Sequence, residues 1–414
     1  MVTRTHPLSY FRKEKVTMNL NSKTKNMQYL RTSNRSAIIK HLVISGSASR
    51  VELSNNLGLT KMAISSIVSD LIAEGYVSEK GYLENKVQNS SGRKANALEV
   101  PKKRINAIGV LIRRHEVYCI SMDIHGSIHS QFHEKLPENA NNDYLIDLIF
   151  KLIDEILKQN SELKYYGIGI ASVGPVDIND RKILEPPKMR EIRNLNIGDL
   201  LEERYQMPVF LDNDMNACAF AENLYGAGKF MKDIAYIGFS NGVGSGIIAD
   251  GTILHGFEGF AAEIGHVSIA MDGPLCYCGR QGCAEVYTSI LYLLQNTGVD
   301  SVESLLEILN RPVVPRYISE SYTIFLKGVE TVLTNIANIF DPEVIIIGDM
   351  ALPFILPHLE DLEKRMNRLK FIQGFKDISV VSSHFKEKTP IVGSGAIVFK
   401  KIFTGQIDLS DKKQ

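Results

Sequence analysis

Apolar positions in the first hundred residues recur at helical spacing in short segments. In one segment they are Ile38, Ile39, Leu42 and Val43. In another they are Ile64, Ile67, Val68, Leu71 and Ile72, which stand at i, i+3, i+4, i+7 and i+8. This spacing places them on one face of a helix, so the pattern predicts amphipathic helices that bury a single stripe.

A third helix is predicted between these two, with signals for both of its ends. Ser49-Arg50-Val51-Glu52 forms a capping box, in which the serine oxygen and the glutamate satisfy each other's free backbone amides. Gly58 suits the left-handed residue that ends a helix. Thr60 is a good N-cap for the helix that follows. A capped helix, a short turn and a second amphipathic helix predict a helix-turn-helix.

Two short strands are predicted after this unit, over GYVSEK (75–80) and ANALEV (95–100), and the polar loop between them would form a wing. Side chains off the apolar stripe are small, polar or basic, as base edges and phosphates in a major groove require. The candidate DNA contacts are Thr60, Lys61, Met62, Ser65, Ser66, Arg93 and Lys94, with Arg93 and Lys94 on the wing. The alternative is a helical hairpin that only packs on its neighbour.

From residue 105 the pattern changes to strands that alternate with helices. Strands are predicted at 107–112, 117–123, 128–136, 166–173, 208–211, 234–239, 246–250 and 344–347. Helices are predicted at 145–157, 217–225 and 322–340, with Gly393-Ser394-Gly395 opening a last one. A similar hairpin occurs at 108–123 and 234–250. This weak internal repeat suggests two related α/β lobes with a cleft between them.

Charge is distributed unevenly along the 414 residues, although the net charge is zero. Residues 1–104 hold 18 basic and 7 acidic side chains, whereas the remainder holds 29 and 40. A basic front on an acidic body favours a nucleic-acid-binding module joined to a second domain. Residues 1–27 are polar and basic and are expected to form a flexible arm, unless the protein begins at Met18. No apolar run is long enough to span a bilayer and no signal peptide is visible, which points to the cytoplasm.

Three of the five cysteines fall within eight residues, in the stretch GHVSIAMDGPLCYCGRQGCAE (265–285). Cys276, Cys278 and Cys283, with His266 ten residues earlier, make one imidazole and three thiolates, the usual composition of a closed structural zinc site. Glycines and a proline punctuate the loop, so its backbone can turn tightly. The alternatives are a disulfide, which a reducing compartment disfavours, and unrelated buried thiols.

Four motifs together resemble the ROK family of repressors, open-reading-frame proteins and sugar kinases. They are Asn213-Asp214-Met215-Asn216, SNGVGSGII (240–248), Ala262-Glu263-Ile264-Gly265-His266 and the cysteine run Cys276–Glu285. The resemblance covers about residues 30–404, and the winged front places the chain with the repressor branch. It implies an actin-like fold, a duplicated ribonuclease-H-like pair of lobes around a cleft.

The same resemblance implies a sugar-binding set of Asn213, Asp214, Glu263, His266 and Glu285. Carboxylates can each accept hydrogen bonds from two vicinal hydroxyls, and an asparagine both donates and accepts. His266 would bind zinc through one ring nitrogen and keep the other for a sugar hydroxyl. Taken alone, Asn213 and Asp214 would suit a strand-end turn with local bonds. Ala262 stands where the family usually has glycine, which would narrow the approach to the ligand.

Phosphoryl transfer requires a phosphate cradle and a carboxylate for the metal ion. Kinases of the family supply both from an Asp-x-Gly-Gly-Thr loop in the first hairpin, whereas the corresponding turn here is Leu111-Ile112-Arg113-Arg114-His115. Gly348, near the adenosine position of the kinases, is followed by Asp349 rather than by a second glycine. Of the kinase's glycine-rich turns, only the one at 240–246 is present, and a tight hairpin is the simpler interpretation of it. The protein is therefore predicted not to be an enzyme, although Asp214 matches the general base of the kinases.

These observations predict a sugar-responsive DNA-binding repressor of carbohydrate-use genes, a homodimer or homotetramer that binds operator DNA and a small neutral sugar or sugar derivative, and no membrane. The expected domains are the arm 1–27, a winged helix-turn-helix 28–100, a two-lobed sugar-binding domain 101–404 with a zinc loop 266–285, and a tail 405–414. The alternatives are a sugar kinase with an added DNA-binding domain and a repressor controlled by a protein partner.

Overall fold

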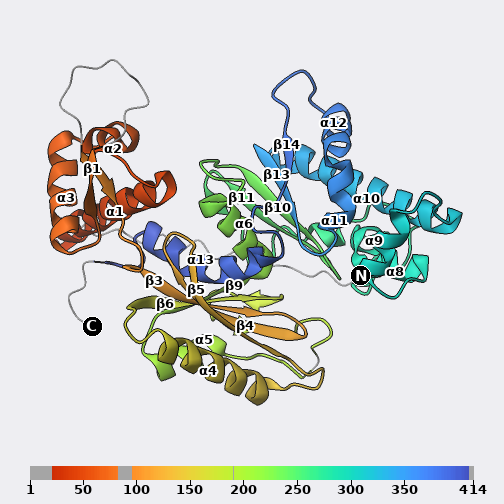
Figure 1. Ribbon diagram of the computed structural model, residues 1–414, viewed down its shortest axis with the longest axis horizontal. Coiled ribbons are helices and arrows are strands. Elements are labelled where there is room, and N and C mark those ends of the chain that lie inside the picture. Colours follow the sequence, from red (N-terminus) through yellow and green to blue (C-terminus); the bar gives the residue numbers. More distant parts are fainter. Residues whose placement is uncertain (1–20, 83–95, 190, 410–414) are drawn as a thin grey trace, which may run out of the picture.

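The computed structural model describes residues 21–82, 96–189 and 191–409 (Figure 1). Its N-terminal winged-helix domain, described over residues 21–82 and 96–100, confirms the predicted helix-turn-helix. The elements of this domain are helices α1 (Asn21–Ser45), α2 (Arg50–Leu57) and α3 (Lys61–Ala73), and the antiparallel strands β1 (Ser78–Tyr82) and β2 (Asn96–Glu99). The capping box of Ser49 and Glu52 is formed, and Gly58 is left-handed with φ 65°.

Two boundaries of this domain differ from the sequence prediction. Helix α1 begins at Asn21, so the expected arm 1–27 is too long and its last seven residues are helical. Strand β1 begins three residues later than predicted, because the backbone first makes the turn that ends α3. The loop of the wing, with Arg93 and Lys94, lies outside the described residues.

The first lobe is a five-stranded sheet in the order β5-β4-β3-β6-β9, with helices α4 (Asn142–Gln159) and α5 (Ile197–Tyr205). Its strands are β3 (Asn106–Ile112), β4 (Glu116–Asp123), β5 (Ile128–Lys135), β6 (Tyr165–Ser172) and β9 (Val209–Asn213). Strands β3, β4 and β5 form an antiparallel meander, whereas β6 and β9 run parallel to β3. A small hairpin of β7 (Val176–Asp177) and β8 (Lys182–Ile183) follows β6.

The second lobe repeats this topology in the order β12-β11-β10-β13-β14, which confirms the internal duplication. Its strands are β10 (Ile234–Phe239), β11 (Val243–Ala249), β12 (Thr252–Ile253), β13 (Val344–Gly348) and β14 (Ser379–Ser382). Its helices are α7 (Glu285–Thr288), α8 (Ile290–Thr297), α9 (Val302–Leu309), α10 (Arg316–Phe340), α11 (Leu352–Ile355) and α12 (Leu359–Leu369). Short 3₁₀ turns occur at Ile264–His266, Leu356–His358 and Lys386–Lys388.

Two helices lie between the sheets: α6 (Asp214–Tyr225), which leaves β9, and α13 (Thr389–Phe403) (Figure 1). Helix α6 packs on β10 and β11 of the second lobe, and α13 packs on α6 and on β3 and β6 of the first. Gly393 and Gly395 do not open α13, as the sequence analysis expected, but lie within it. A Cβ at Gly393 would come within 2.6 Å of the backbone of Ala217, so glycine permits the close approach of α13 to α6.

The winged-helix domain packs on the two-lobed body through hydrogen bonds and a shared apolar cluster. Tyr76 and Tyr166 share a hydrogen bond of 2.8 Å between their hydroxyls, and His125 of the first lobe contacts the carbonyl of Val100. Helix α1 contacts α13, and their apolar side chains belong to one continuous buried cluster. Leu409 is buried, so the first residues of the expected tail 405–414 belong to the folded body. Within the described residues, no helix has the length and apolarity needed to cross a bilayer.

Candidate functional site

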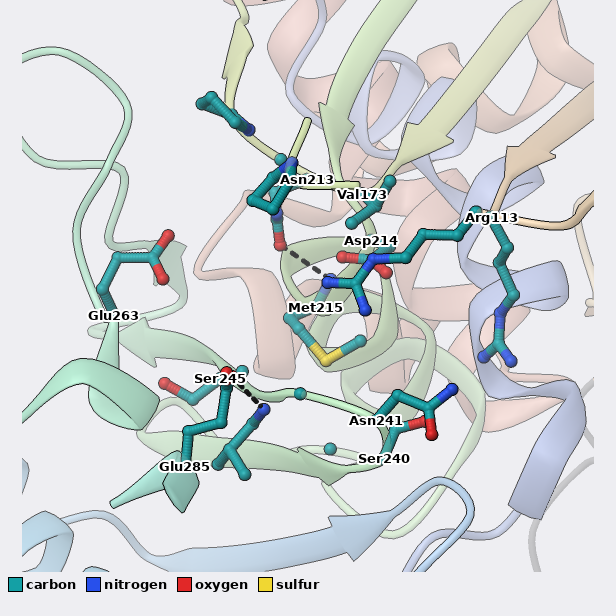
Figure 2. A pocket seen from close by; sticks show the side chains of 18 of the residues that line it. Arg113, Val173, Asn213, Asp214, Met215, Ser240, Asn241, Ser245, Glu263 and Glu285 are labelled. Carbon is teal, nitrogen blue, oxygen red and sulfur yellow. Dashed lines mark hydrogen bonds between the residues drawn. The ribbon is translucent and has the colours of Figure 1, made fainter. Parts of the chain in front are cut away.

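A cavity of about 620 Å³ lies between the lobes. All five residues of the predicted sugar-binding set line it, from both lobes: Asn213, Asp214, Glu263, His266 and Glu285. Figure 2 shows Asp214, Glu263 and Glu285 around one space, with Arg113 on the side opposite Glu263. The five residues of this set, which span positions 213 to 285 of the sequence, therefore surround one cavity.

Asn213 and Asp214 stand at the junction of β9 and α6. Asn213 is the N-cap of α6, and its side-chain oxygen accepts a hydrogen bond of 2.8 Å from the amide of Met215. This is the local turn that the sequence analysis considered, and it leaves the side-chain nitrogen available. Burial raises the pKa of Asp214 to about 7, while Arg113 opposes the shift and Asp349 adds to it. Asp214 can therefore act either as an acceptor or as a donor near neutral pH.

The second lobe fixes Glu285 through the glycine-rich turn of the β10–β11 hairpin. Its Oε2 accepts a hydrogen bond of 2.9 Å from the amide of Val243. A Cβ at Gly242 would lie 2.9 Å from that same oxygen, so the glycine makes room for the carboxylate. Glu263 faces the cavity nearby, and burial with the charge of Glu285 raises its pKa, against the effect of His266. The glycine-rich turn thus positions a candidate ligand residue.

A candidate metal-binding cluster adjoins the cavity. The ligand atoms of His266, Cys276, Cys278 and Cys283 all lie within 4.8 Å of one another. His266 turns Nδ1 toward the cysteines, at 3.7 Å from the sulfur of Cys276. The loop is closed by a hydrogen bond of 2.8 Å from the amide of Cys276 to the carbonyl of Arg280. One nitrogen and three sulfur donors converging in this way can hold a tetrahedral metal ion.

The turn of the first hairpin places a basic side chain in the cavity wall. Arg113, at the β3–β4 turn, lies 3.7 Å from the carboxylate of Asp349, which follows β13 in the other lobe. Asp349 is buried and adopts a left-handed φ of 71°. Burial raises the pKa of Asp349, and Arg113 opposes that shift. A cation–carboxylate contact thus crosses the cleft between the lobes.

A second contact between the lobes was missed by the sequence analysis. His255, in the loop after β12, lies 2.9 Å through Nε2 from Oδ2 of Asp212, at the end of β9. Asn216 donates to the other oxygen of Asp212 at 2.9 Å. Burial disfavours ionisation of Asp212, but these hydrogen bonds and the nearby cations hold its pKa below the usual range. Asp212 directly precedes Asn213 and Asp214, and no local signal in the sequence marks His255 as its partner.

The exposed face of α3 carries most of the candidate DNA contacts. Lys61, Met62, Ser65 and Ser66 are all exposed. The hydroxyl of Thr60 accepts a hydrogen bond of 3.2 Å from the amide of Ala63, so it caps the helix. Four other cations of the domain are paired: Arg31 with Asp70, Arg35 with Glu74, Arg50 with Glu79 and Lys80 with Glu99. Among the residues that the structure describes, Lys61 has no ion-pair partner and faces solvent.

Comparison with known proteins gives a consistent result. The ROK family profile matches residues 107–401. The chain is 27% identical to the xylose repressor of Caldicellulosiruptor bescii over 92% of this chain and 98% of that protein. It is 25% identical to the DNA-binding transcriptional repressor Mlc of Escherichia coli over 92% of this chain and 96% of Mlc.

Solved structures with the same fold include both regulators and kinases. A ROK family transcriptional regulator, described as a homolog of the E. coli MLC protein, aligns with a TM-score of 0.75 at 21% identity, over 92% of this chain and 98% of that chain. A ROK family glucokinase from Streptomyces griseus, in complex with glucose and AMPPNP, aligns with a TM-score of 0.60 at 25% identity, over 70% of this chain and 98% of that chain.

Proposed function

The chain belongs to the ROK family, and from this premise we propose that it is a sugar-responsive, DNA-binding transcriptional repressor of carbohydrate-use genes. The observation that carries the proposal is the position of the cavity. It is lined by acidic and amide side chains of both lobes and lies at the start of α6, which packs on α13. Helix α13 in turn contacts α1 of the winged-helix domain.

The lining suits a sugar or sugar derivative. Asp214, Glu263 and Glu285 offer several acceptor oxygens for vicinal hydroxyls, and Asn213 adds a donor. These groups come from both lobes, so a sugar that contacts all of them binds best to one separation of the lobes. A ligand shifts a conformational equilibrium only through such a difference in affinity. Sugar binding would therefore favour one arrangement of the lobes over another.

The winged-helix domain would respond through α13. Helix α13 contacts α6, strands β3 and β6, and α1. A change in lobe separation would therefore change the surface of the body against which the winged-helix domain packs. In two-fold symmetric DNA-binding proteins, the affinity for paired half-sites depends on the spacing of the two recognition helices. We expect a homodimer or homotetramer, acting in the cytoplasm, whose two α3 helices fit paired half-sites without sugar and no longer fit them when sugar is bound.

The metal ion is proposed to be zinc with a structural role. His266, Cys276, Cys278 and Cys283 would provide all four ligands, which leaves no position open for chemistry. When bound, the ion would cross-link the loop that carries His266 and precedes Glu285. The ring of His266 would then join the metal ion to the cavity, and the ion would hold two lining residues in place.

A kinase is the competing function, and Arg113 argues against it. The turn that binds phosphate in kinases has neither glycine nor an acidic residue at 111–115 here, and the Arg113 side chain lies across the cleft beside Asp349. The other alternative is a repressor whose DNA binding is controlled by a protein partner. It would keep the winged-helix domain but would show no saturable binding of any sugar.

The test is a thermal-shift panel of neutral and phosphorylated sugars, with ATP–Mg as a separate arm. We expect a rise in melting temperature with one sugar class and none with ATP–Mg. A rise with ATP–Mg would revive the kinase, and sugar-dependent ATP consumption would then decide. No rise with any compound would favour a protein partner over a sugar.

A further inference from the structure

Tyr277 occupies a position that the sugar-binding set does not explain. It stands between two of the clustered cysteines, Cys276 and Cys278, and its side chain lines the cavity. Its hydroxyl lies 3.1 Å from Nε2 of His266, and the two rings meet edge to face with centroids 5.2 Å apart. The nitrogen of His266 that does not face the cysteines is thus already in contact with a residue of the protein.

The two ring nitrogens of His266 have different partners. Nδ1 faces the sulfur of Cys276, so a metal ion would take the lone pair on that nitrogen. With the metal ion bound, Nε2 would carry the ring's hydrogen and would donate it to the hydroxyl oxygen of Tyr277, which lies 3.1 Å away. A single N–H makes one strong hydrogen bond, so a sugar hydroxyl and Tyr277 cannot both accept it fully.

We propose that Tyr277 is a built-in competitor of the ligand: its hydroxyl occupies Nε2 of His266 in the empty cavity, and the sugar binds by displacing it. This inference rests on the proposed sugar-binding function of the same cavity. It makes Tyr277 a residue that sets ligand affinity, and therefore the sugar concentration at which the protein responds. A ligand without a hydroxyl to accept the His266 hydrogen would not compete.

The surroundings of Tyr277 allow this exchange. The residue is 59% exposed, so packing does not lock its ring in place. Within the described part of the chain, His266 is the one hydrogen-bond partner of its hydroxyl. The backbone around it is held by two hydrogen bonds, from the amide of Cys276 to the carbonyl of Arg280 and from the amide of Gly279 to the carbonyl of Cys276. The side chain can therefore swing away by rotation about its own bonds while the loop stays closed.

The test is the affinity of Tyr277→Phe for three probes, xylose, glucose and N-acetylglucosamine, measured by calorimetry on the full-length protein loaded with zinc. The substitution keeps the ring and removes only the competing oxygen. Because a net hydrogen bond of about 0.5–1.5 kcal/mol is no longer broken on binding, we expect the dissociation constant to fall roughly two- to tenfold. Tyr317→Phe is the matched control, since Tyr317 is 57% exposed and lies on α10 away from the cavity.

A second measurement reports the displacement directly. With 3-fluorotyrosine placed at position 277 alone, the ¹⁹F resonance should move on saturation with the probe that binds. Weaker binding by Tyr277→Phe would mean that the hydroxyl contacts the sugar, and unchanged binding with an unmoved resonance would mean that it takes no part; either overturns the proposal while leaving sugar binding intact. No heat with any probe for the wild type or the variant would instead overturn the sugar-binding function together with it.

Discussion

The guanidinium of Arg113 in the first lobe lies 3.7 Å from the carboxylate of Asp349 in the second. Both residues stand where the resemblance predicts a departure from the pattern of the family's kinases, one at the turn of the first hairpin and one after the strand β13. The two departures form one interaction. We interpret the pair as a contact between the lobes that replaces the nucleotide contacts of a kinase.

If Arg113 and Asp349 stabilise the cleft as a pair, their substitutions should not be additive. Arg113→Ala leaves a buried carboxyl without its cation and should lower the free energy of unfolding by about 1–3 kcal/mol. Adding Asp349→Asn should recover part of that loss, because the unpaired charge is gone. Urea unfolding of the two single variants and the double variant measures the coupling. Strictly additive effects would mean that the two side chains are independent.

The raised pKa of Asp214 predicts a specific pH dependence. The folded-state pKa of about 7 is above the ordinary value of 3.8, so the folded protein binds the extra proton and stability falls as pH rises between those values. Three units correspond to at most about 4 kcal/mol. Asp214→Asn should be more stable than the wild type at pH 8 and nearly equal to it at pH 4. Unfolding curves at both values test this, and parallel pH profiles would contradict it.

Metal removal should affect the cavity as well as the loop. Wild-type protein should contain about one zinc per chain, and Cys283→Ser should contain far less by elemental analysis. Because His266 and Glu285 flank the cluster, we expect sugar affinity to fall by roughly tenfold or more when the metal is chelated. Zinc added back should restore it, whereas magnesium should not. Full sugar affinity in metal-free protein would separate the cluster from the ligand site.

Lys61 should contribute to DNA binding through the phosphate backbone. It lies in the first turn of α3 and is exposed. Lys61→Ala should weaken binding to all sequences alike and should reduce the slope of log affinity against log salt by about 1. Lys158→Ala is a suitable control, because Lys158 is exposed on α4 of the first lobe. A change in sequence preference without a change in slope would instead indicate a base contact.

Much of the architecture was predictable because local signals and packing agree. The apolar stripe from Ile64 to Leu71 is buried as predicted, the Ser49 capping box begins α2, and the left-handed Gly58 ends it. The repeated hairpin predicted two lobes. The two sheets have the same strand order, so each begins with the same succession of apolar strands, and the sequence shows that succession twice. The glycines of α13 were misplaced because their reason is tertiary: they permit contact with Ala217.

The cavity was predictable only in part. A family pattern names Asn213, Asp214 and Glu285 because they stand in contiguous motifs. The contacts of Arg113 with Asp349 and of His255 with Asp212 join positions 236 and 43 residues apart, and neither pair has a motif. Such contacts depend on how the lobes meet, and a one-dimensional pattern does not contain that geometry.

The most direct test of the central claim is the affinity of the full-length protein for its selected operator DNA, titrated with the sugar that raises the melting temperature. The account predicts that saturating sugar raises the dissociation constant for DNA by about 5–150-fold, the usual range of coupling between two sites. Glu285→Gln, which loses one carboxylate of the cavity, should bind DNA normally and should need much more sugar. Operator affinity that sugar leaves unchanged or increases would contradict the account.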